Sequence, residues 1–102
     1  MHWNSGIVNL AWTLLASGGT HPRGKTSTVV PGIGIWRASR IFYRALTSYF
    51  TSQTNLEGAR YATAEAAHDL YDGSIASSVH AAWDAVGVGS GVGRRRGGQR
   101  HG

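Results

Sequence analysis

The sequence of 102 residues contains no cysteine and only two prolines. Without cysteine, no disulfide can staple the fold and no thiolate can bind a metal ion. No apolar run approaches the roughly 20 residues that a membrane-spanning helix needs, so we expect no membrane partner. The first residues also lack the basic segment and apolar stretch of an export signal. The fold must therefore rest on the burial of apolar side chains.

Acidic side chains are scarce, because five Asp and Glu stand against ten Lys and Arg, for a formal net charge of +5. The excess is confined to one end of the chain. Residues 1–88 carry six basic and five acidic side chains, whereas residues 89–102 add four arginines and no acid. The body is nearly neutral, and the Gly/Arg-rich segment 89–102, which has no apolar period, is predicted to be a disordered basic tail.

The body of the chain shows helical periodicity. Apolar residues recur three and four positions apart, which places them on one face of a helix, in segments of roughly 5–16 and 36–50. Between these two segments, the prolines and glycines of 20–34 exclude a continuous helix, and Val29 and Val30 are expected to be extended. The second helix is predicted to bury Ile41, Phe42, Ala45, Leu46 and Tyr49 and to leave Arg37, Arg40 and Arg44 solvated.

Two further helices are predicted in the second half of the chain. Thr54 followed by Glu57 fits a capping box at the start of the third helix, whose alanines allow close approach of a neighbour. Asp72 and Gly73 are expected to end it, and a fourth helix is expected over about 77–85, closed by Gly87. The fold class is therefore all-α, with one four-helix domain over 1–88. Three tryptophans are expected in its core: Trp12, Trp36 and Trp83.

The opening residues carry a recognisable motif. His2-Trp3-Asn4-Ser5-Gly6-Ile7 resembles the His-x-Asn-Ser-Gly-Ile segment of the thermolysin-like zinc metallopeptidases, peptidase family M4. Further matches follow in the order of that family: GGTH at 18–21, GIG at 32–34, IFYRALT at 41–47, AHDLY at 67–71 and AWDAVGV at 82–88. The segment from His21 to Gly32 looks a few residues longer than the usual connection of the family.

This resemblance implies the C-terminal helical lobe of a secreted, two-lobed zinc endopeptidase. In such an enzyme the other lobe binds zinc through a His-Glu-x-x-His helix and a later Glu. None of the five histidines here is followed by Glu, so the chain holds no such motif and is expected to be inactive alone. Zinc is thus a cofactor of the parent enzyme, calcium is a second candidate there, and peptide or protein substrates would bind through the absent N-terminal lobe.

The same resemblance assigns a catalytic role to His2. In the family this histidine hydrogen-bonds the oxyanion that develops when water attacks the scissile carbonyl, and it is described as a proton donor. An Asp that orients its imidazole would lie before Met1. Trp3 flanks His2 and is a candidate for lining the cleft.

The remaining histidines are not predicted to bind metal. His21 is expected to pack or hydrogen-bond within its turn, and His68 and His80 are expected at the surface or half-buried, since no carboxylate pattern completes a site around them. We therefore predict no metal ligand in this chain.

Two other functional classes remain open at this point. The chain is also compatible with a stand-alone helical module that binds nucleic acid or an acidic partner through its arginine tail. However, no aromatic residues interleave with those arginines, so nucleic acid is not the expected partner. An inactive product whose exposed lobe face aggregates is the other alternative.

Overall fold

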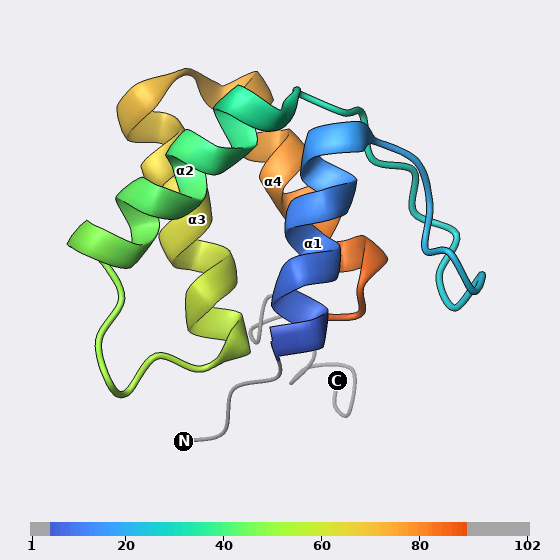
Figure 1. Cartoon of the computed structure of the whole chain (residues 1–102), viewed down its shortest axis with the longest axis horizontal. Coiled ribbons are helices and arrows are strands. Elements are labelled where there is room, and N and C mark those ends of the chain that lie inside the picture. Colours follow the sequence, from blue (N-terminus) through green and yellow to red (C-terminus); the bar gives the residue numbers. More distant parts are fainter. Residues whose placement is uncertain (1–4, 90–102) are drawn as a thin grey trace, which may run out of the picture.

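The computed structural model describes residues 5–89, which form four α-helices and a single isolated β-bridge (Figure 1). The helices are α1 (Ser5–Ser17), α2 (Ile35–Ser48), α3 (Leu56–Leu70) and α4 (Gly73–Ala85). α4 packs against both α1 and α3, and α2 crosses in front of α3 and reaches α1 (Figure 1). The predicted all-α fold is confirmed. Among the described residues, no helix has the length and apolar character to span a bilayer.

The core lies between these helices and is built largely from alanine. Ala59, Ala66 and Ala67 of α3 are completely buried, as the sequence predicts, and their small side chains let α4 approach closely. Trp83 of α4 fills the centre of the core at 0% exposure, with its ring stacked 6.3 Å from that of Phe42. The predicted interhelical contact of α3 is therefore confirmed.

The three tryptophans that were predicted to lie in the core differ in burial. Trp83 is buried as predicted and Trp12 is half-buried against the core, but Trp36 is 81% exposed and its predicted burial is wrong. The buried residues of α2 are Ala38, Ile41 and Ala45. Trp36 precedes Ala38 by two positions, which turns it about 200° away around a helix of 3.6 residues per turn.

The same helical phase explains two more errors on α2. Leu46 and Tyr49 were expected on its buried side, but they are 58% and 38% exposed. Leu46 directly follows Ala45, so it is rotated by about 100° from the line of closest contact. The buried stripe of α2 is consequently narrower than its apolar composition indicates.

Both later helices start differently from the prediction. Asn55 caps α3 by accepting a 2.7 Å hydrogen bond from the Gly58 N–H, whereas Thr54 accepts from the Thr51 N–H in the preceding turn. Asp72 caps α4 through the Ser74 and Ile75 N–H groups, so α4 begins at Gly73 instead of 77. A capping carboxylate that satisfies two free donors outweighs the local preference of glycine to end a helix.

Two glycines allow the chain to reverse after α1. Gly18 ends the helix at φ +81° with its N–H donating to the Leu14 carbonyl, and a Cβ on Gly18 would lie 2.7 Å from the Gly32 nitrogen. This close crossing lets Gly19 and Val30 exchange two backbone hydrogen bonds of 2.9 and 2.8 Å. The extended conformation expected at Val30 is thus confirmed as a bridge that holds the 20–34 loop against α1.

Candidate functional site

The predicted catalytic residue, His2, lies outside the described residues, as do Trp3 and residues 90–102 of the predicted tail. The described chain begins at Ser5, which is the last residue of the His-x-Asn-Ser segment and the first residue of α1. Ala11 and Leu15 of α1 are completely buried. The helix that begins at the end of this predicted catalytic segment is therefore packed firmly into the core.

A groove of about 530 Å³ runs beside this first turn of α1, and we name it the α1 groove. Its floor is apolar and half-buried, and its rim is basic and exposed. The residues that line it are Gly6, Ile7, Leu10, His21, Pro22, Arg23, Lys25 and Val86. Its size falls within the range of about 300–1,000 Å³ that is typical of ligand pockets.

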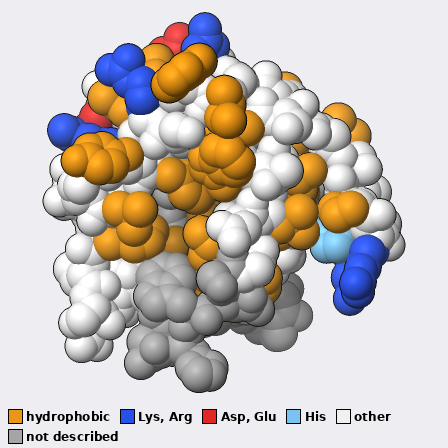
Figure 2. All heavy atoms as spheres, in the orientation of Figure 1, with side chains coloured by type: hydrophobic (Ala, Val, Ile, Leu, Met, Phe, Trp, Pro, Cys, Tyr) orange, Lys and Arg blue, Asp and Glu red, His pale blue; other side chains and the backbone are white. Residues whose placement is uncertain are grey.

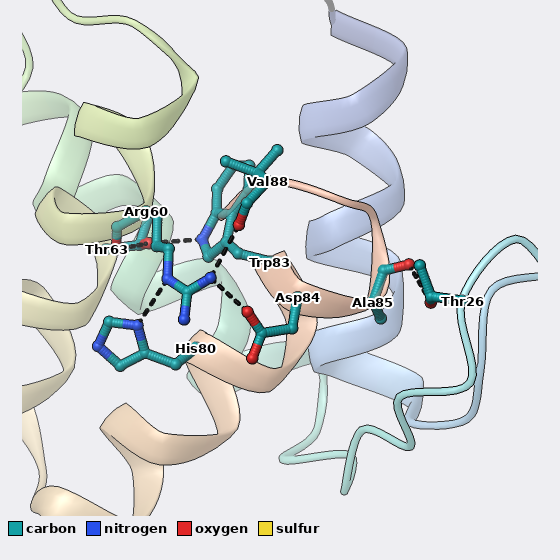
Figure 3. Close-up of polar contacts among 8 residues, drawn as sticks. All are labelled: Thr26, Arg60, Thr63, His80, Trp83, Asp84, Ala85 and Val88. Atoms are coloured by element: carbon teal, nitrogen blue, oxygen red, sulfur yellow. Dashed lines mark hydrogen bonds and ion pairs between the residues drawn. The ribbon is translucent and has the colours of Figure 1, made fainter. Parts of the chain in front are cut away.

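The basic rim of the α1 groove belongs to a turn with defined geometry. The Arg23 N–H donates to His21 Nδ1 at 3.0 Å, and the Gly24 N–H donates to the His21 carbonyl at 2.9 Å. The predicted hydrogen bonding of His21 within its turn is confirmed. Further along, the Thr26 hydroxyl donates to the Ala85 carbonyl at 2.6 Å and ties the loop to the end of α4 (Figure 3).

A second polar centre, which sequence reasoning missed, surrounds Arg60 of α3 (Figure 3). Arg60 is only 7% exposed, and its Nε donates to His80 Nδ1 at 2.9 Å. One terminal nitrogen pairs with Asp84 and also donates to the Val88 carbonyl at 2.8 Å. One feature of the sequence indicated that Arg60 is buried: it directly follows Ala59, a residue on the predicted buried side of α3.

The Arg60 cluster fixes the turn that ends α4. Gly87, at φ +84°, closes the helix as predicted, and the Val88 N–H returns to the Trp83 carbonyl at 2.9 Å. Because the Val88 carbonyl accepts from Arg60, the residues after α4 are held against α3. This cluster is a structural clamp and does not line the α1 groove.

The surroundings of His80 favour the neutral form of its imidazole. Burial, followed by the charge of Arg60, lowers the pKa of His80, while Asp84 opposes the shift. An acceptor at Nδ1 also requires that nitrogen to be unprotonated. Tyr61 packs edge-on against the imidazole, with ring centroids 6.2 Å apart.

Zinc ligation is not supported by the described part of the chain. A catalytic zinc needs three protein ligands and an open position. Residues 5–89 contain no group of three His, Cys, Asp or Glu side chains that could hold a metal ion. His80 Nδ1 already accepts a hydrogen bond from Arg60, and His68 is an exposed residue of α3.

A second groove, of about 470 Å³, lies along the outer side of α2. Trp36 and Tyr43 line it together with Arg40, Arg44 and Leu70. The arginines of α2 are exposed as predicted. Figure 2 shows Lys or Arg side chains next to acidic side chains at the upper left of the molecule.

One of these arginines forms an ion pair. Arg44 lies 3.2 Å from Asp69, which also accepts a hydrogen bond from the Tyr49 hydroxyl. That hydrogen bond is the main cause of the lowered pKa of Asp69, with Arg44 contributing. The charge of the α2 groove is therefore partly neutralised.

The four helices and the first-turn groove define a compact helical lobe. The alpha-helical domain of the thermolysin metallopeptidases matches this chain over residues 1–88. Bacillolysin of Bacillus cereus is 43% identical over 90 residues, which cover 86% of this chain and 15% of that relative. Thermolysin of Alicyclobacillus acidocaldarius subsp. acidocaldarius is 43% identical over 86% of this chain and 16% of its own length. Neutral protease B of Bacillus subtilis (strain 168) is 46% identical over the same shares.

The chain therefore belongs to the thermolysin metallopeptidase family and corresponds to its alpha-helical domain. The resemblance carried by the motifs at both ends of 1–88 is confirmed. The chain spans about 15–16% of the length of these relatives.

Proposed function

We propose that residues 1–88 act as the C-terminal lobe of an extracellular zinc endopeptidase that cleaves peptide or protein substrates, with residues 89–102 as an appended tail. The observation that carries this proposal is the family match over 1–88, which includes the His2-to-Ile7 motif. This chain covers 15–16% of the relatives, so the part of each relative that it does not match is more than five times as long as the matched domain. A partner half that binds zinc is consistent with those lengths.

The contribution of this chain to the reaction is His2. When bound in the parent enzyme, zinc would polarise the scissile carbonyl and activate water. The part of His2 is to donate a hydrogen bond to the oxyanion, which stabilises charge where it forms. α1, which begins within the His2-to-Ile7 motif and is anchored by buried Ala11 and Leu15, supplies rigid support for that role.

A chimera tests this proposal. Residues 1–88 replace the matching segment of B. cereus bacillolysin, and the product is assayed for zinc and for chelator-sensitive peptide hydrolysis. We expect activity in the chimera and neither stoichiometric zinc nor hydrolysis in the 102-residue chain alone.

Either of two results would contradict the proposal. Zinc-dependent hydrolysis by the chain alone would show that it is complete without a partner half. A chimera that folds and binds zinc but turns over no peptide would show that this lobe does not support the reaction.

A further inference from the structure

The α1 groove combines an apolar floor with unpaired positive charge. Arg23 and Lys25 are exposed and form no ion pair with any other described residue. None of the described residues that line the groove is acidic. In Figure 2 the basic side chains at the loop on the right stand beside a histidine, whereas red acidic groups appear only at the upper left. The groove therefore attracts negative charge.

The floor of the groove offers contacts of a different kind. Ile7 and Leu10 of α1 lie opposite Val86, and each is half-buried. An apolar side chain placed on them would lose further surface to water, with a gain of roughly 25 cal/mol per Å². The groove is thus suited to a segment that carries an apolar side chain next to carboxylates.

The rim is also preorganised. The two hydrogen bonds to His21 shape the turn that carries Arg23, and the Thr26–Ala85 bond anchors the loop just after Lys25. Fixed donors lose less conformational entropy on binding than donors on a mobile loop.

The length of the chain between Gly6 and His2 limits how far the groove can lie from His2. Gly6 lines the groove and follows His2 by four residues, so their Cα atoms are at most about 14 Å apart. An extended peptide covers that distance with about four residues. A peptide that is cleaved beside His2 therefore needs only about four further residues to reach the groove.

Two other occupants fit poorly because of charge. The segment 89–102 carries four arginines and no acid, so it would be repelled by the rim. A second copy docked through the same groove would place like charges opposite each other.

We propose that the α1 groove binds an acidic segment of the peptide substrate, with an apolar side chain on Ile7, Leu10 and Val86 and carboxylates at Arg23 and Lys25. The assignment to substrate rests on the proposed function. It makes the parent enzyme selective for chains that carry acidic residues a few positions from the cleaved bond.

Binding to the 102-residue chain tests the groove without any catalysis. The probes are fluorescein-labelled Gly-Leu-Glu-Glu and its neutral analogue Gly-Leu-Gln-Gln, titrated at low salt and at about 0.15 M salt, where charges are screened beyond about 8 Å. We expect tighter binding of the acidic probe, loss of that preference with salt, and NMR shift changes at the Leu10 and Val86 methyl groups.

Matched variants identify the cations responsible. Arg23→Ser/Lys25→Ser should weaken binding of the acidic probe about fivefold, as two exposed ion pairs would. Arg37→Ser/Arg40→Ser removes the same net charge from α2 and should leave the affinity unchanged. Equal affinity for the two probes, or equal losses in the two variants, would overturn the proposal.

The chimera gives a second measurement that holds even if the isolated chain does not fold. The ratio of kcat/KM for otherwise identical acidic and neutral peptides should fall about fivefold with Arg23→Ser/Lys25→Ser. A ratio that does not move would reject the groove assignment. An inactive chimera would reject the proposed function instead, and the binding titration would still decide the groove.

Discussion

The α3–α4 pair and the outer side of α2 differ in which side chains they bury. The pair buries alanines and pairs the buried hydroxyl of Thr63. This hydroxyl accepts from Trp83 Nε1 at 2.8 Å (Figure 3) and donates to the Ala59 carbonyl at 2.8 Å. The outer side of α2 instead exposes Trp36 and Tyr43, which are 81% and 70% accessible.

The N-terminal ends of the helices also differ between the two regions. Asn55 and Asp72 cap α3 and α4 with side-chain hydrogen bonds, whereas the residue before α2 is Gly34, which makes no side-chain cap. Stability is therefore concentrated in the α3–α4 pair. Apolar side chains on α2 are available for contacts outside this domain.

The difference between the two regions is tested most strongly by replacing one tryptophan in each region with alanine. Trp83→Ala should lower the free energy of unfolding by about 3–5 kcal/mol, because it empties the centre of the core. Trp36→Ala should change it by less than about 0.5 kcal/mol. Urea unfolding followed by circular dichroism measures both, and similar losses in the two variants would contradict the described core.

Arg60 tests whether the clamp at the end of α4 matters for stability. Arg60→Met keeps the aliphatic length but removes the donors to His80, Asp84 and the Val88 carbonyl. We expect a loss of about 1–3 kcal/mol, since the buried Val88 carbonyl and the half-buried His80 Nδ1 are left unsatisfied. Arg40→Met, at an exposed position on α2, is the control. Hydrogen exchange should also speed up at the Val88 amide, and unchanged exchange there would argue against a clamp.

The cap of α3 has a smaller expected effect. Asn55→Ala should cost about 1 kcal/mol through loss of the bond to the Gly58 N–H, and Asn55→Asp should retain most of the stability. Thermal unfolding of the two variants compares them directly. If alanine and aspartate behave alike, the side-chain cap does not stabilise the helix.

The smallest effect concerns pH. The pKa of His80 is lowered from its ordinary 6.5, mainly by burial, so the unfolded chain binds this proton more readily than the folded chain. The free energy of unfolding should therefore fall as the pH drops below about 6.5, and level off below the folded pKa. His80→Gln keeps an acceptor for Arg60 without titrating. Denaturant unfolding at about pH 7.5 and pH 5 should show a shallower pH dependence in this variant, and an unchanged slope would remove His80 as its source.

The sequence predicts much of the α3–α4 pair because its alanines recur with helical spacing and only one face is apolar. On α2 two faces are plausible, since Trp36 and Tyr43 lie seven residues apart on one side and Ile41 and Ala45 lie on another. Side-chain size favoured burial of Trp36, but packing against α1 and α3 selected the face with Ala38. That choice depends on neighbouring helices and is not encoded locally.

The polar centres were predicted less well. Arg60 finds its partners 20 to 28 residues further along the chain, and only the packing of α3 on α4 brings them together. The α1 groove depends on Gly24 at φ +67° and on a bond from Thr26 to a carbonyl 59 residues away. His2, in contrast, was identified from a contiguous motif, which needs no tertiary information.

The central claim is that this lobe brings His2 to the reaction, and the kinetics of the bacillolysin chimera test it most directly. In that chimera, His2→Ala should lower kcat by about 100- to 1,000-fold, the usual effect of removing one oxyanion donor, while zinc content and stability stay unchanged. A kcat within a few-fold of the unsubstituted chimera would show that His2 does not stabilise the transition state and would contradict the proposed role of this chain.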